Sequence, residues 1–77
     1  MTTYEAKIKT FLEKETQHQI ESDGTNLIEK GVLDSFSMIK LINFVETELG
    51  VKVDMEEITP GNFNSVETIA RKIETWR

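Results

Sequence analysis

The sequence contains no cysteine, a single histidine (His18), one proline and four glycines among its 77 residues. Without cysteine, the chain has no disulfide framework, no thiolate metal site and no cysteine nucleophile. The single histidine also excludes a metal site that is built from several histidines. Glycine and proline are too sparse for a disordered linker. We therefore expect residues 1–77 to form one small domain without a bound metal.

Basic residues are outnumbered, with nine lysines and arginines against 14 acids and a formal net charge of −5. An acidic surface repels nucleic acid and anionic lipid, because phosphate neutralisation requires clustered lysine and arginine. Apolar runs fall far short of the roughly 20 residues that a membrane helix needs, and no basic and then apolar leader opens the chain. The composition predicts a cytoplasmic monomer that neither binds nucleic acid nor inserts into membranes.

The N-terminal segment shows helical periodicity from about Thr3, and we expect this helix to end between Glu15 and Gln17. Its apolar stripe consists of Tyr4, Ile8, Phe11 and Leu12. From His18 to Leu33 the period is lost, and turn-forming residues indicate a long loop. Long loops in compact domains are usually anchored or functional. The residues that we expect to anchor this loop to the core are Leu27, Ile28, Val32 and Leu33.

Residues 35–49 carry the strongest helical pattern. Asp34 is expected to cap the helix, and Gly50 to follow it with a positive φ. The predicted core face consists of Met38, Leu41, Ile42, Val45 and Leu49. The opposite face consists of Phe36, Lys40, Asn43 and Thr47, with Ile39 and Phe44 at its flanks.

The C-terminal third predicts one further long helix and one short one. Residues 51–55 alternate between apolar and polar but lack a partner strand, so we expect an extended connector. A single helical turn is expected within residues 55–59. Asn64 or Ser65 should cap the last helix, and Asn64 with Glu67 has the spacing of a capping box. The inner residues of that helix are Val66, Ile69, Ala70, Ile73 and Trp76. The sum is a small all-α bundle.

The dipeptide Asp34-Ser35 opens the most regular helix of the chain. Serine and aspartate at a helix start are most often caps. The Ser35 hydroxyl is, however, also expected to lie beside unpaired backbone N–H groups, at the positive end of the helix dipole. That environment would stabilise a covalently attached phosphate.

Residues 33–38, Leu-Asp-Ser-Phe-Ser-Met, resemble the modification motif of the acyl carrier protein superfamily, and the similarity covers essentially the whole chain. The resemblance implies a four-helix bundle with a long first loop and a short third helix. It also implies that Ser35 is the attachment site for 4′-phosphopantetheine, which a separate phosphopantetheinyl transferase takes from coenzyme A. The thiol of this arm would hold an acyl or aminoacyl group as a thioester, so the chain would be a carrier without catalytic residues.

The outer side of the helix around Ser35 is the expected docking face for partner enzymes. We define the docking face as Phe36, Ile39, Lys40, Asn43, Phe44 and Thr47. Membership of the core remains an open alternative for both Ile39 and Phe44. Fatty-acid-type carriers have acids where Ser37 and Lys40 stand here, and residues 62–65 look more like aminoacyl or peptidyl carriers. The resemblance therefore favours a specialised carrier of a lipid, cell-envelope or secondary-metabolite pathway, loaded by an acyl or aminoacyl ligase of the adenylate-forming type. Downstream acyl-transfer enzymes would be its other partners.

Three other readings can be compared with the carrier. A helical interaction domain without a prosthetic group would use Ser35 only as part of a helix start. A hydrolase using Ser35 lacks a base and an orienting acid, since His18 is expected to be exposed or packed on the loop. A calcium loop at Asp23-Gly24 lacks the remaining oxygen ligands.

Overall fold

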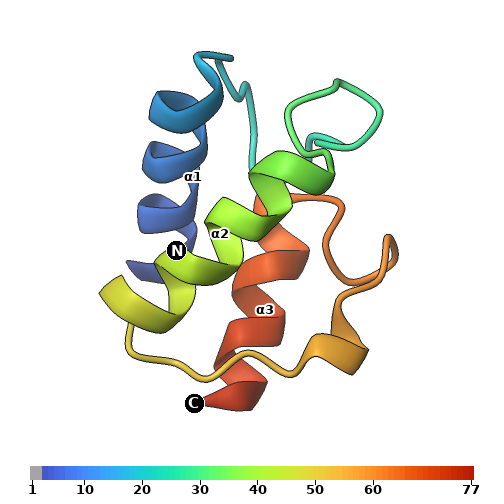
Figure 1. The fold of residues 1–77 in the computed structure, drawn as a ribbon. Helices are drawn as coiled ribbons and strands as arrows, with labels where there is room; N and C mark the ends of the chain where they lie inside the picture. The colour runs from blue at the N-terminus through green and yellow to red at the C-terminus, as the bar shows by residue number, and fades with distance from the viewer. Residues whose placement is uncertain (1–2) are drawn as a thin grey trace.

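Three α-helices and one 3-10 turn form the regular structure of residues 3–77, the part of the chain that this computed structural model describes (Figure 1). The elements are α1 (Thr3–Thr16), α2 (Ser35–Glu48), η1 (Met55–Glu57) and α3 (Val66–Trp76). α1 packs against both α2 and α3. The predicted all-α fold is confirmed, as are the expected bounds of the first two helices within a residue. None of the helices in this described part has the length and apolar character to cross a bilayer.

The expectation of four helices is wrong, because the short third element is a single 3-10 turn. Asp54 caps its start, and the N–H of Ile58 donates to the Met55 carbonyl at 3.3 Å. Thr59 stands before Pro60, and a residue before proline is disfavoured from the helical region of backbone space. The turn therefore ends after three residues.

The core is formed by the inner faces of the helices together with residues from all the connections. The helices contribute Ile8, Leu12, Leu41, Val45, Val66, Ile69, Ala70 and Ile73. The connections contribute Ile20, Leu27, Val32, Leu33, Val51, Val53 and Phe63. The other predicted core residues of the helices are half-buried at its edge: Tyr4, Phe11, Met38, Ile42, Leu49 and Trp76. Burying this apolar surface supplies the main favourable term in folding.

The long first loop is anchored at three of the four predicted residues and at one that was not predicted. Leu27 is fully buried, and its backbone N–H donates to the Asn64 carbonyl at 2.6 Å. Ile28 was predicted as an anchor, which is wrong, because it is 40% exposed. The turn directs the Leu27 side chain into the core and the Ile28 side chain toward solvent. The additional anchor is Ile20, whose N–H donates to the Glu13 carboxylate at 2.8 Å.

The ends of the helices follow local sequence signals, with one shift. Gly50 has a φ of 68°, as predicted, and the connector after it is extended. The capping box of α3 joins Ser65 to Thr68, so the proposed pairing of Asn64 with Glu67 is wrong. The Asn64 side chain instead accepts a hydrogen bond from the Thr68 hydroxyl, while Ser65 caps the Thr68 N–H.

Candidate functional site

Ser35 is the first residue of α2, at the point where the long loop enters the helix (Figure 1). Its side chain is exposed, and its hydroxyl makes no hydrogen bond to any residue between 3 and 77. The backbone N–H groups of a first helical turn lack partners inside the helix and carry the positive end of its dipole. The Ser35 oxygen is therefore accessible, and it lies at the positive end of the α2 dipole.

Asp34 and Ser37 fix the start of α2 around this hydroxyl. The Asp34 carboxylate accepts the backbone N–H of Ser37 at 2.9 Å, and the Asp34 N–H donates to the Ser37 hydroxyl oxygen at 2.9 Å. This reciprocal pair is a capping box. The Ser37 hydroxyl is buried and donates to the carbonyl of Val32 at 3.0 Å. The loop and the helix are thus joined on both sides of Ser35, and the predicted cap at Asp34 is confirmed.

The capping box also sets the charge at the helix start. The backbone N–H of Ser37, and then its hydroxyl, hydrogen-bond to the Asp34 carboxylate and lower its pKa below the ordinary value of 3.8. The cause is that both donors stabilise the charged form. Asp34 is therefore ionised at neutral pH. Its charge complements the positive end of the α2 dipole.

The residues of the predicted docking face lie together on the outer side of α2. Phe36 is 69% exposed and Ile39 is 67% exposed, so Ile39 does not belong to the core. Phe44 is half-buried, and its ring stacks on Phe11 of α1 with centroids 4.3 Å apart. A surface hollow of about 560 Å³ brings five docking-face residues together with three further side chains. The docking-face members are Ile39, Lys40, Asn43, Phe44 and Thr47, and the others are Phe11, Glu15 and Glu48.

Lys40 is neutralised within the docking face. Its ammonium lies 2.7 Å from the Glu15 carboxylate of α1 and 4.8 Å from the centroid of the Phe36 ring. A cation over an aromatic face is attracted by the ring. Sequence reasoning missed Glu15, since nothing in a single sequence connects two exposed residues 25 positions apart. The docking face is consequently less positive than Lys40 alone suggests.

His18 was expected to be either exposed or packed on the loop, and it is exposed. It lies close to the start of α2. It lines a small hollow of about 220 Å³ together with Asp34, Phe36 and Lys40, among others. Ser35 does not line this hollow, and no hydrogen bond joins it to His18 within the described residues. The residues from 3 to 77 therefore do not form a serine–histidine pair of the kind that activates a nucleophile.

Comparison with known proteins gives two curated relatives, while no family model matches the chain. The chain is 35% identical over 68 residues to aminoacyl carrier protein 1 of Bradyrhizobium diazoefficiens. This alignment covers 88% of this chain and 74% of the relative. It is 33% identical over 58 residues to the probable acyl carrier protein PigG of Serratia sp., covering 70% and 67% of the two chains.

A solved structure is similar to this chain in both fold and sequence. A chain of a crystal structure described as that of an FAD-dependent dehydrogenase matches with a TM-score of 0.76 and 32% identity, covering 86% of this chain and 97% of that one. The two curated relatives are both named as carrier proteins, and the matches span most of each chain. Carriers hold a group for other enzymes and do not catalyse its reactions. The chain thus belongs to the acyl carrier protein family.

Proposed function

We propose that this carrier holds its cargo on a 4′-phosphopantetheine arm attached to Ser35, with the cargo bound as a thioester to the thiol of the arm. The observation that supports this assignment most directly is the exposed hydroxyl of Ser35, which makes no hydrogen bond within residues 3–77. The family relationship implies such an arm, and Ser35 stands where the resemblance places its attachment.

The residues around Ser35 fit a phosphodiester. The first turn of α2 presents the positive end of the helix dipole beside Ser35, while its Ser37 N–H is already bound by the Asp34 carboxylate. The Ser35 oxygen would form a new bond to the phosphorus of coenzyme A that bears the pantetheine, its proton would be released, and 3′,5′-ADP would leave. A phosphopantetheinyl transferase supplies the activating groups, which agrees with the lack of a serine–histidine pair among the described residues.

We further propose that the cargo is an aminoacyl group, loaded by an adenylate-forming ligase, in a specialised pathway. One relative is named an aminoacyl carrier protein, at 35% identity. The docking face supports the same choice, because Lys40 and Glu15 neutralise each other where fatty-acid-type carriers are expected to be acidic. Such a face would not steer strongly basic partners.

An FAD-dependent dehydrogenase is a candidate downstream partner. The chain that matches in the crystal structure of that description is nearly the same length as this chain, since the alignment covers 86% and 97% of the two. A domain of this size is too small to hold a flavin and a dehydrogenase site by itself. We therefore propose that this carrier associates with an enzyme of the class named in that description.

Intact-mass measurement after incubation with coenzyme A and a broad-specificity phosphopantetheinyl transferase tests the attachment site. The wild-type chain should gain the mass of one phosphopantetheine group, and Ser35→Ala should gain none. Ser22→Ala, in the exposed loop, is the matched control and should be modified like wild type. If the wild-type chain stays unmodified while a known carrier is modified in the same tube, the alternative of an interaction domain without a prosthetic group is favoured.

The cargo is tested by the mass of the protein isolated from its native cell. A mass increase equal to the arm plus one amino-acid residue, removed by hydroxylamine, supports an aminoacyl thioester. A fatty acyl mass on the arm would contradict the aminoacyl assignment and leave the attachment site intact.

A further inference from the structure

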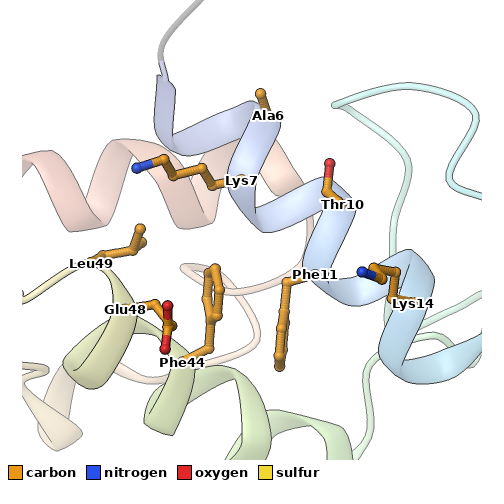
Figure 2. Close-up of a pocket in the computed structure, with 8 residues that line it drawn as sticks. All are labelled: Ala6, Lys7, Thr10, Phe11, Lys14, Phe44, Glu48 and Leu49. Atoms are coloured by element: carbon orange, nitrogen blue, oxygen red, sulfur yellow. The ribbon is translucent and has the colours of Figure 1, made fainter.

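A second hollow lies between α1 and α2 beyond the docking face, and we call it the α1–α2 groove (Figure 2). It has a volume of about 470 Å³. The residues that line it are Ala6, Lys7, Thr10, Phe11, Lys14, Phe44, Glu48 and Leu49. Only Phe44 belongs to the docking face as well, so most of this surface is separate from the surroundings of Ser35.

The groove exists because large and small side chains meet unevenly at the contact between α1 and α2. Phe11 and Phe44 extend toward each other from the two helices and stack with an interplanar angle of 17° (Figure 2). Ala6 and Thr10, on the adjacent part of α1, are small and exposed and leave the space beside the rings open. Both rings are half-buried, as is Leu49. The resulting surface is apolar and suits one large hydrophobic side chain.

The charges along the groove are arranged asymmetrically. Lys7 and Lys14 are exposed on the α1 side, and neither forms an ion pair with any of the described residues. They are seven positions apart, which is two helical turns or about 10.5 Å along the axis. Glu48 is on the α2 side of the groove (Figure 2). One edge therefore attracts anionic groups and the other repels them.

We propose that the α1–α2 groove binds an amphipathic helix of a partner protein. This helix would place a large apolar side chain on the Phe11–Phe44 pair and two carboxylates, two turns apart, against Lys7 and Lys14. A groove between two packed helices accommodates a third helix, and recognition by spaced anchors is a recurrent mode of such binding. Because the chain carries a net charge of −5, an acidic helix is repelled by most of the surface. The two lysines thus determine where on the surface the partner helix binds and in which orientation it lies in the groove.

The test is an NMR titration of the full-length protein with a designed helical peptide. The probe is an acetylated and amidated peptide that carries two glutamates seven positions apart, with a leucine between them on the same face. Addition of this peptide should shift the amide signals of Lys7, Thr10 and Phe44, while a peptide with lysines in place of the glutamates should not. The binding requires no arm, so its outcome is independent of the attachment at Ser35.

Charge reversal supplies the decisive control. The double variant Lys7→Glu/Lys14→Glu should weaken binding of the glutamate peptide about tenfold or more and allow the lysine peptide to bind. Lys52→Glu, at an exposed position outside the groove, changes charge in the same direction and should leave the affinity within about twofold. The proposal is overturned if the glutamate peptide does not bind, if the double variant binds it like wild type, or if the shifts map to Phe36 and Ile39 instead. Unchanged thermal melting of each variant verifies that it is folded.

Discussion

Two serines near the start of α2, separated by one residue, have opposite environments. Ser37 is 5% exposed and its hydroxyl is committed to Asp34 and Val32, whereas Ser35 is exposed and its hydroxyl makes no hydrogen bond within residues 3–77. The N-cap at Asp34 could be predicted from the sequence, because an acid before a strong periodic helix is a local signal. That Ser37 closes the capping box could not, because serine is not the usual residue at the third helical position.

Exchanging these serines for alanine should therefore have unequal effects on stability. Ser37→Ala removes the hydrogen bonds to Asp34 and Val32 and should lower the free energy of unfolding by about 1–2 kcal/mol. Ser35→Ala removes no hydrogen bond to the described part of the chain and should change this free energy by less than about 0.5 kcal/mol. Urea denaturation followed by circular dichroism measures both. Equal losses in the two variants would show that the Ser35 hydroxyl has a structural role.

The Asp34 cap should make stability depend on pH in the acidic range. Because its pKa is lower in the folded chain than the ordinary 3.8, its contribution is present above that value and is lost as the pH falls through the folded pKa. Asp34→Asn keeps a capping oxygen but cannot ionise. The urea midpoint of wild type should exceed that of Asp34→Asn at about pH 6, and the difference should shrink as the pH falls below the ordinary pKa of 3.8. A difference that persists unchanged at the lower pH would contradict this assignment.

At the scale of the elements, the helices could be predicted from the sequence. Which side chains of the connections are buried could be predicted only in part. Hydrophobic periodicity over 14 residues locates α1 and α2. The loop before α2 has no such period, so its inward and outward side chains are decided by turns and by distant partners. Leu27 is held by the carbonyl of Asn64, 37 positions away. Ile20 was missed and Ile28 was misassigned for this reason.

The pair Leu27 and Ile28 offers a direct comparison of a buried anchor with its exposed neighbour. Leu27→Ala should lower the free energy of unfolding by about 2–5 kcal/mol, because it leaves a cavity where the side chain is fully buried. Ile28→Ala, at a 40% exposed position, should cost less than about 1 kcal/mol. Chemical denaturation measures both values, and hydrogen exchange should show faster opening of the loop amides in the first variant only. Similar losses in both would mean that Ile28 also holds the loop.

For the whole molecule, the way α1 lies across α2 decides the character of the outer surface. Its approach stacks Phe11 on Phe44 and joins Glu15 to Lys40. Each helix could be predicted by itself, but their relative placement depends on how side chains fit across the contact. The neutral charge of the docking face and the α1–α2 groove both follow from that placement. Neither could be derived from a single sequence.

Recognition by other proteins is the property that belongs to this scale, and Phe36→Ala tests it. Phe36 is 69% exposed, so its removal should shift the melting temperature by no more than about 4 °C. The rate at which a phosphopantetheinyl transferase modifies Ser35 should fall about tenfold or more, because an exposed aromatic side chain beside the site is a typical binding anchor. Glu29→Ala, on the exposed loop, serves as the control. An unchanged rate would remove Phe36 from the docking face.

The tie between Ser37 and the Val32 carbonyl has a further consequence for the proposed carrier. It fixes the end of the loop to the start of α2, so the proposed attachment point at Ser35 would not move independently of the helix. The reach of a group held on the proposed arm would then depend mainly on the length of the arm. If the arm is attached at Ser35 as proposed, the enzymes that act on its cargo would approach the same end of α2, and one bound enzyme would exclude another.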